Sequence, residues 1–371
     1  MKSLGIIAEF NPFHQGHQYL IEKSMKDTGS DVCITVMSGN FVQRGTPAVF
    51  DKWTRAERAV KNGVNLVVEL PTVFACNSAE YFAEGGVGIL EGFGCIDNIA
   101  FGSESGDLEA LQKAADFLKD NDKALHARIS ELTKQGHSYP KARQIAVMEI
   151  NPDFDENLMK EPNNILAIEY LKQLKTIKPF TLKRRGYGYH QSATMIREEM
   201  REEFPEKFRR LDRSYWELVG AKILQTDSKR LEEIFSAGEG LGNKLKNEIR
   251  YVSSTEQLIE RIKSKVYTYS RISRLLTHIL LDIDDKVMTE SAKYIRILAL
   301  DDVGAKFIKE VKKRECASLP ILTNINRETR DYLHIQPTLE KDILASDMYN
   351  IITKNDLYDY SDYIMKPYIE I

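Results

Sequence analysis

The sequence has few cysteines and no long apolar run, and each shortage excludes a class of protein. Its four cysteines, Cys33, Cys76, Cys95 and Cys316, form no close pair in the sequence. This spacing predicts neither a disulfide framework nor a zinc knuckle. The start, MKSLGIIAEF, has too short an apolar run for a signal peptide, and no stretch is long enough for a membrane span. We therefore expect a cytoplasmic protein with no membrane partner, and nothing in the sequence indicates a protein partner.

The chain also lacks a large net charge, because 52 basic and 55 acidic residues give a formal net charge of -3. Taken whole, this balance argues against a generic basic nucleic-acid coat and against an acidic disordered chain. The charge is unevenly spread, however. Residues 1–180 hold 19 basic and 24 acidic residues, residues 181–330 hold 30 and 23, and residues 331–371 hold 3 and 8. The basic middle section is compatible with a polyanionic partner.

The first half of the chain alternates short apolar runs with helix-like segments. We expect strands at residues 4–8, 32–37, 66–70 and 96–101, and helices at residues 17–25, 53–61 and 79–90. Strands that are apolar throughout and separated by helices predict a parallel sheet covered on both faces. Such α/β sheets bind ligands at the carboxyl ends of their strands, near a topological switch point. We therefore predict a Rossmann-like domain.

Long charged amphipathic segments dominate the second half, for example residues 205–224 and 256–282. Two apolar runs, at 294–300 and 319–325, flank a helical pattern at 303–314, which predicts a small strand–helix–strand unit with a right-handed crossover. The expected organisation is an α/β domain over residues 1–200 and a mainly helical region with a small α/β element over residues 201–371. The length of 371 residues is consistent with two or three domains.

The strongest chemical signal is the segment EFNPFHQGH directly after the first predicted strand. Its His14-x-Gly16-His17 tetrad opens a predicted helix. Amide N–H groups at a helix N-terminus favour an anion, and imidazoles spaced three apart lie on one side of the first turn, where they can donate to phosphate oxygens. Gly16 leaves room for close approach of a nucleotide. Short motifs also arise by chance, but here a strand precedes the tetrad and a helix follows it.

A second phosphate-type motif, Ser192-x-Thr194-x-x-Arg197, stands just before an amphipathic segment. Hydroxyls, helix N-terminal amides and the fixed charge of Arg197 can hold phosphates together. On its own the motif is explained about as well by a Ser/Thr helix cap. Together with the upstream tetrad it indicates adenylyl transfer from ATP.

These motifs resemble the His-x-Gly-His nucleotidyltransferase superfamily, which is related to class I aminoacyl-tRNA synthetases. The similarity is closer to one family. The segments GIIAEFNPFHQGH, MSGNFVQRG, EPNNILA and YTYSRISRLL look like those of the bacterial tRNA-Met cytidine acetate ligases. The resemblance covers most of the chain and is loosest over residues 200–250.

The resemblance implies a two-step reaction. Acetate and ATP would give acetyl-adenylate and pyrophosphate, and the acetyl group would then pass to N4 of the wobble cytidine of elongator methionine tRNA. Its catalytic residues would be His14 and His17, which would stabilise the charge that builds on the phosphate oxygens. Mg²⁺ would bind through the ATP phosphates, because this ion usually keeps waters and binds substrate phosphates, and we expect no protein ligands for a metal.

The same resemblance implies a set of ATP contacts. It comprises Ile7, Ala8, Glu9, Phe10, Asn11, Pro12, Phe13, His14, Gln15, Gly16, His17, Gln18, Tyr19, Leu20, Gly102, Asn163, Arg184, Arg185, Ser192, Thr194 and Arg197. Several members have ordinary alternatives: Gly102 after the fourth strand suits a turn, Asn163 suits a helix N-cap, and Arg184–Arg185 suits a solvated charge cluster.

The polar segment after the second predicted strand, Ser38-Gly39-Asn40, opens onto the same edge of the sheet. Lys52 and Arg55 are spaced for one helix face and are candidates to reach phosphates or tRNA. Asp51 is equally suited to cap that helix. Glu9 is a candidate to orient a histidine, or to be a structural group behind the site.

For the tRNA we expect a surface in the basic middle section, where cations interleave with Tyr267 and Tyr269. Its predicted contacts are Lys263, Lys265, Arg271 and Arg274. A second basic stripe comprises Lys306, Lys309, Lys312, Lys313 and Arg314. Solvated helix faces are the alternative for both, and more strongly for the second.

Two other functions stay open on the sequence. One is a small-molecule nucleotidyltransferase that transfers adenylate to a phosphorylated acceptor, although such enzymes are typically far shorter. The other is a non-catalytic RNA-binding protein that keeps a nucleotide-binding fold, against which the intact His14, Gly16, His17 and Arg197 argue.

Overall fold

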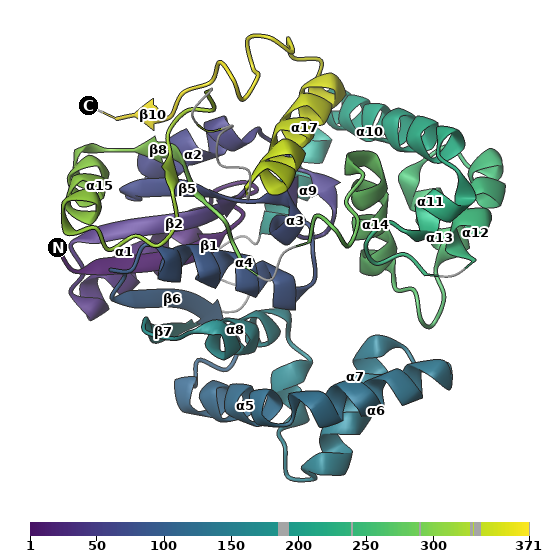
Figure 1. The fold of residues 1–371 in the computed structure, drawn as a ribbon, viewed down its shortest axis with the longest axis horizontal. Coiled ribbons are helices and arrows are strands. Elements are labelled where there is room, and N and C mark those ends of the chain that lie inside the picture. The colour runs from purple at the N-terminus through teal and green to yellow at the C-terminus, as the bar shows by residue number, and fades with distance from the viewer. Residues whose placement is uncertain (185–192, 239, 289–290, 327–328, 330–334, 371) are drawn as a thin grey trace.

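The computed structural model describes residues 1–184, 193–238, 240–288, 291–326, 329 and 335–370. A single large sheet forms the centre of the molecule, and helices cover both of its faces (Figure 1). The strands of this sheet follow the order β10-β8-β5-β2-β1-β6-β7, and β9 pairs with β8. Their bounds are β1 Ser3–Ala8, β2 Val32–Ser38, β5 Leu66–Leu70, β6 Asn98–Ser103, β7 Lys178–Lys183, β8 Ile295–Leu300, β9 Ile321–Leu322 and β10 Tyr368–Ile369.

Five neighbouring strands, from β5 through β2, β1 and β6 to β7, are all parallel. The chain moves outward from the central β1 first to one side and then to the other, which is the doubly wound arrangement. The switch point therefore lies between the carboxyl ends of β1 and β6. This confirms the Rossmann-like sheet that the apolar runs predict.

Alternate residues of β1 explain why both faces of the sheet are covered. Leu4 and Ile6 belong to the core cluster beneath α1 (Gln15–Thr28) and α2 (Lys52–Val60). On the opposite face, Ile7 packs on Gly86 of α4 (Ala79–Gly92). A strand with apolar residues of both parities can only be buried on both sides.

Helices of two further groups flank the sheet. Helices α5 to α7 extend from the β6 side (Figure 1), and the group from α10 to α14 lies beside the β3–β4 hairpin (Phe41–Val42 and Thr46–Pro47). The remaining bounds are α3 Thr72–Ala75, α5 Leu108–Asp120, α6 Asp122–Lys134, α7 Tyr139–Ile150, η1 Glu156–Met159, α8 Pro162–Gln173, α9 Ala193–Glu203, α10 Pro205–Gln225, α11 Ser228–Glu232, α12 Leu241–Glu248, η2 Ile249–Tyr251, α13 Thr255–Ile262, α14 Tyr269–Leu281, α15 Asp302–Arg314 and α17 Gln336–Thr353. Among the described residues, none of the helices combines the length and the apolar character needed to cross a membrane.

The C-terminal strands differ from the expected separate unit. β8 and β9 do form a parallel pair around α15, but β8 also pairs antiparallel with β5 and so extends the main sheet. β10, close to the C-terminus, adds the outermost strand. In the sequence, the runs at 294–300 and 319–325 look like a self-contained unit. The pairing of β8 with the distant strand β5 leaves no local sequence signal. A division at residue 200 stays a prediction, although three strands from beyond it complete the first region's sheet.

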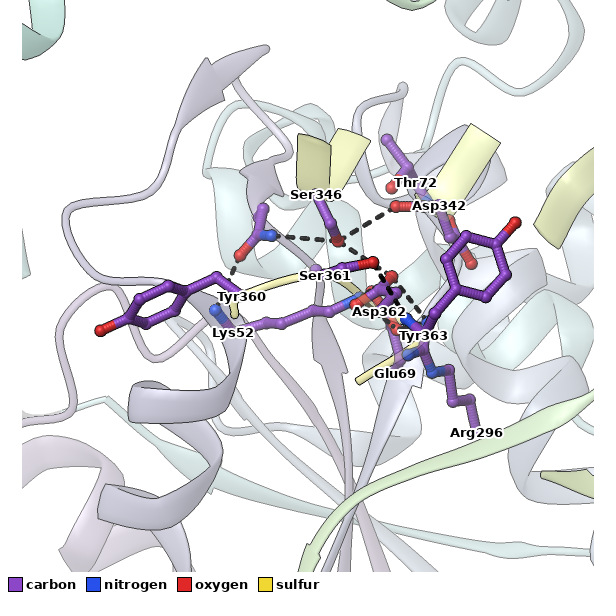
Figure 2. A network of polar contacts seen from close by, with 12 residues as sticks. Lys52, Glu69, Thr72, Arg296, Asp342, Ser346, Tyr360, Ser361, Asp362 and Tyr363 are labelled. Carbon is purple, nitrogen blue, oxygen red and sulfur yellow. Dashed lines mark hydrogen bonds and ion pairs between the residues drawn. The ribbon is translucent and has the colours of Figure 1, made fainter. Parts of the chain in front are cut away.

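A buried ionic network joins α2, β5, β8 and the C-terminal tail (Figure 2). Lys52 Nζ contacts Glu69 Oε1 at 2.8 Å and Asp362 Oδ2 at 2.9 Å, and its side chain is 0% exposed. Arg296 Nη1 contacts the same Asp362 oxygen at 2.8 Å. Two cations thus face two carboxylates, and Asp342 lies beside them, accepting from Tyr294 and from the Thr72 amide. Burial and the neighbouring Glu69 raise the pKa of Asp342 to about 7.

Replacing Lys52 by methionine tests how far the fold depends on this network. We expect the Lys52→Met protein to lose about 3–5 kcal/mol of unfolding free energy, because Glu69 and Asp362 keep only Arg296 as a buried cation. Urea denaturation at pH 7 measures this loss. The matched control is Lys61→Met, which removes an exposed pair with Glu57 next to the same helix and should change stability little. Equal effects of the two substitutions would contradict a role for the buried network.

Candidate active site

The loop after β1 places two imidazoles at the N-terminus of α1. His14 is the N-cap of α1, and its Nδ1 accepts from the Gly16 amide at 3.0 Å. His17 Nδ1 accepts from the His14 amide at 3.3 Å, which completes a reciprocal capping box. Since both Nδ1 atoms are acceptors, the neutral rings carry their protons on Nε2. Both histidines are therefore oriented as Nε2–H donors at a helix N-terminus.

Aromatic packing fixes the positions of these rings. The His14 and His17 rings are stacked with centroids 3.7 Å apart, and Phe10 lies edge-on to His17 at 4.9 Å. Burial, and then the charges of His14 and Arg184, hold the pKa of His17 well below its usual value. His17 is accordingly a neutral donor at physiological pH.

Three predicted contacts meet beside the switch point, at the ends of β6 and β7. Arg184 directly follows β7, and its Nη1 donates to Asn163 Oδ1 at 3.0 Å. Its Cγ lies only 3.1 Å from where a Cβ at Gly102 would stand. Gly102 is not a turn residue after the strand, which was its ordinary alternative, but lies within the last part of β6. Glycine there allows Arg184 to lie across the strand toward His17.

Asn163 is not the N-cap of α8, because Glu161 occupies that position without a side-chain cap bond. The N-terminal amides of α8 are instead taken by Glu104, which follows β6. Its carboxylate accepts from the amide of Asn164 at 2.7 Å and from Asn163 Nδ2 at 2.6 Å. Glu104 was not among the predicted site residues. Two features of the sequence could have pointed to Glu104. It follows a predicted strand, and no Ser, Thr or Asp stands directly before Pro162 to cap the helix that begins there.

Thr194 and Arg197 of the second phosphate-type motif lie within α9 and not before it. Arg197 Nη1 donates to the Asn11 carbonyl at 2.7 Å, and Nη2 donates to Thr194 Oγ1 at 3.1 Å. The motif is thereby joined to the loop that carries His14 and His17. Arg185 and Ser192, the other two predicted contacts of this region, lie outside the described residues.

Glu9 and Asp51 make the structural contacts that were their alternatives in the sequence analysis. Glu9 Oε1 accepts from the Gln43 amide at 2.7 Å, so its carboxylate links two loops. Asp51 caps α2 by accepting from the Thr54 amide at 2.8 Å. The expectation that Lys52 and Arg55 reach phosphates or tRNA is wrong, because both are buried, at 0% and 1% exposure. Helical spacing placed them on one face, but that face is turned into the protein.

The other members of the segment from 7 to 20 are divided between core and surface. Ile7 and Leu20 pack in the two core clusters, whereas Gln18 bonds Glu22 on the exposed side of α1. The buried Asn11 accepts from the Val49 amide at 2.9 Å. Ala8, Pro12, Phe13, Gln15 and Tyr19 complete the strand end, the loop and the first turns of the helix. These side chains shape the edge of the sheet, and their contact with ATP stays a prediction.

The predicted tRNA contacts lie at the junction of α13 and α14. The single amphipathic segment expected over 256–282 is broken there by residues 263–268. Lys263 and Lys265 are exposed, and Lys265 lines a cavity of about 430 Å³ together with residues 135–138 and Lys141. Arg271 lies over the Tyr267 ring at 4.7 Å and donates to the Ser236 carbonyl. Two exposed lysines and a tyrosine-supported arginine thus share one surface.

Arg274 is only partly exposed and lies against the β3–β4 turn. Burial lowers its pKa, and the charge of Arg271 acts in the same direction. A Cβ on Gly45, whose φ is 72°, would lie 2.4 Å from the Arg274 Cα. The second basic stripe is carried by α15, which Figure 1 places on the other side of the molecule from α14. The two stripes therefore do not form one surface.

The fold and this edge define the class of protein. Two imidazoles, a helix N-terminus and Arg197 surround the carboxyl end of β1 at the switch point. Among the described residues, no group of three or more His, Cys, Asp or Glu side chains could hold a metal ion. The arrangement is that of a His-x-Gly-His nucleotidyltransferase. The family model for HIGH Nucleotidyl Transferase matches residues 1–362.

Comparison with known proteins narrows the class. A protein of Caldanaerobacter subterraneus subsp. tengcongensis, named tRNA(Met) cytidine acetate ligase, is 40% identical over 96% of each chain. One of the same name from Clostridium perfringens is 37% identical over 100% of each. The crystal structure of Thermotoga maritima TmcAL bound with alpha-thio ATP has a TM-score of 0.89 and 31% identity, over 100% of this chain and 99% of that one. The chain belongs to the tRNA(Met) cytidine acetate ligases of the HIGH nucleotidyltransferase family, which confirms the resemblance.

The lowered pKa of His17 predicts the protonation state of its ring in solution. We expect the His17 ring to stay neutral, with its proton on Nε2, from pH 7.5 down to pH 6, because burial and nearby positive charge oppose protonation. Two-dimensional NMR of the ¹⁵N-histidine-labelled protein measures this, and a His17→Gln spectrum assigns the signal. Movement of the His17 ring nitrogens toward the imidazolium positions over that range would contradict the assignment.

Proposed function

We propose that the chain forms acetyl-adenylate from acetate and ATP at the carboxyl ends of β1 and β6, and then acetylates N4 of the wobble cytidine of elongator methionine tRNA. An acetate oxygen attacks the α-phosphorus, the bond to the bridging oxygen breaks, and pyrophosphate leaves. The cytidine amine then attacks the acetyl carbonyl carbon, AMP leaves and the amine gives up one proton. The pair of Nε2–H donors at the N-terminus of α1 carries this proposal.

His14 and His17 donate to the phosphate oxygens as charge develops on them in the first step. His17 suits this role for two reasons. Its neutral ring presents Nε2–H as a donor. Phe10 and the His14 amide hold the ring in place, so it needs no reorganisation during the reaction. The α1 amides add positive potential at the same place. Arg197 lies on the far side of the loop and supplies a fixed charge for the leaving pyrophosphate.

Gly102, Asn163 and Arg184 form the adenosine side of the site. Arg184 lies against Gly102 and donates to Asn163, and Glu104 holds Asn163 in place. The backbone at Gly102 leaves space for a base or ribose to lie against the strand. The site of the Thermotoga maritima protein, whose crystals contain alpha-thio ATP, supports ATP as the nucleotide.

Mg²⁺ would enter with ATP and neutralise phosphate charge. This ion usually keeps several waters and binds substrate phosphates in place of a dedicated protein cage. We place the reaction in the cytoplasm, where ATP and tRNA are both at hand. Lys263, Lys265, Arg271 and Arg274 form the proposed tRNA surface, and their juxtaposition with Tyr267 suits phosphates and unpaired bases.

Removing the imidazoles should abolish adenylation and spare tRNA binding. His17→Ala takes away one donor, and His14→Asn removes the other while leaving a side-chain oxygen that can still cap the Gly16 amide. For each variant we expect acetate-dependent ATP–pyrophosphate exchange to fall by about a hundredfold or more, with the dissociation constant for tRNA within about threefold of the original. Exchange at the original rate would overturn the assigned roles.

The tRNA surface predicts the salt dependence of binding. Lys265→Ala and Arg271→Ala should each weaken tRNA binding and reduce the slope of log K against log salt by about 0.7–0.9 for each phosphate that is no longer neutralised. Lys309→Ala is the matched control, because this exposed lysine lies on α15, away from α14. Filter binding between about 50 and 200 mM salt measures the slopes. An unaltered slope in the first two variants, or an equal change in the control, would refute this surface.

A further inference from the structure

Arg55 is a buried cation whose partners are all backbone carbonyls. Its side chain lies in α2 and the residue is 1% exposed. Nε donates to the Phe50 carbonyl at 2.9 Å, while Nη1 donates to the carbonyl of Glu9 and Nη2 to that of Gly39. Within the described ranges no carboxylate forms an ion pair with it, in contrast to Lys52 one turn earlier. So unusual a placement of charge calls for a physical reason.

The two outer carbonyls belong to different loops at the reactive edge of the sheet. Glu9 directly follows β1 and begins the segment that carries His14 and His17. Gly39 directly follows β2 and begins the segment that leads to the β3–β4 hairpin. β1 and β2 are parallel neighbours, so the guanidinium bridges the two chains at the point where their ladder ends. The Glu9 carboxylate adds a second link through the Gln43 amide, at 2.7 Å.

Only a guanidinium can make this bridge. Its planar fork carries five N–H donors in fixed directions, whereas a lysine ammonium is a point donor that cannot reach three separated carbonyls in one plane. Burial without an ion partner opposes the charge and lowers the pKa of Arg55, although nearby acidic groups counteract the effect. A buried cation is costly unless hydrogen bonds compensate for its burial, and here three backbone carbonyls accept from it.

We propose that Arg55 is a positioning residue for acetate adenylation, which sets the distance between the histidine-bearing loop after β1 and the Gly39 loop after β2. This inference rests on the proposed function of that edge. Arg55 reaches no phosphate itself, since the protein encloses it. Its effect is transmitted through the Glu9 carbonyl to a loop whose histidines must stand at hydrogen-bonding distance from the α-phosphate.

Gly39 is held from its other side as well. A Cβ at this position would lie 2.6 Å from Glu69 Oε1. The Glu69 carboxylate cannot easily move away, because Lys52 Nζ holds both of its oxygens, at 2.8 and 2.9 Å. The Gly39 peptide is thus enclosed between the Arg55 guanidinium and the buried ionic network of Figure 2. Because Lys52 holds the Glu69 carboxylate, we expect a methyl group at residue 39 to move the Gly39 peptide, and with it the carbonyl that Arg55 binds.

The kinetics of Arg55→Lys test the proposal. In acetate-dependent ATP–pyrophosphate exchange, we expect kcat to fall about tenfold to hundredfold, because small displacements of reacting groups carry penalties of this size. The KM for ATP should change less than about threefold, since the Arg55 guanidinium bonds to Phe50, Glu9 and Gly39 and not to the adenosine side of the site. A purely structural role would lower the unfolding temperature and leave the kcat of folded protein intact, and this outcome would overturn the proposal.

Controls separate the possible failures. Arg143→Lys alters another largely enclosed arginine, whose partner Glu169 also binds Lys172, and it should leave kcat unchanged. Absence of exchange in the unmutated protein would refute the proposed function and not the role of Arg55. If Arg55→Lys does not fold, Gly39→Ala decides, because it shifts the same carbonyl with the guanidinium retained. A folded Gly39→Ala protein with the original kcat would overturn the positioning role.

Discussion

The reactive edge depends on the parallel pairing of β1 with β2 on one side and β6 on the other. This pairing brings three strand ends to one edge of the sheet, where the loops that follow them meet. The loop after β1 carries the histidines, the loop after β2 begins at Gly39, and Glu104 follows β6. Side-chain bonds then hold loops whose own backbones have left the ladder. Arg55 joins the first two, and Glu104 joins the third to α8.

The same loops connect the segment that carries the histidines to the helical part of the chain. The Gly45 carbonyl, at the β3–β4 turn, accepts from Thr277 Oγ1 at 2.9 Å and from Tyr215 at 3.3 Å. Thr277 lies on α14, the helix that also bears Arg271 and Arg274. A continuous set of contacts therefore runs from the proposed tRNA surface through the hairpin to Gln43 and the Glu9 carboxylate.

Local patterns predicted most of the first region. Apolar runs located β1, β2, β5 and β6 within a few residues, and the tetrad with its flanking strand and helix located the histidines, because these signals are contained in short segments. The partners of Lys52 and Arg55 could not be found in this way. Asp362 lies 310 residues from Lys52, and a backbone carbonyl such as that of Gly39 has no residue-type signal at all. Glu104 could not be predicted for the same reason, because its partners Asn163 and Asn164 lie 59 and 60 positions away in the sequence.

Charge counted along the sequence describes the surface of this protein incompletely. The acidic section from 331 to 371 includes Asp342 and Asp362, and both are 0% exposed. Although burial alone would raise the pKa of Asp362, the adjacent Arg296 and Lys52 lower it, so this carboxylate is ionised and paired inside the protein. Asp342, whose pKa is raised to about 7, is partly neutral near physiological pH. Part of the negative charge in the tail therefore serves as the counterion of cations from the first region and from β8. That part adds little to repulsion of RNA, because its field is cancelled within a few ångströms by Lys52 and Arg296.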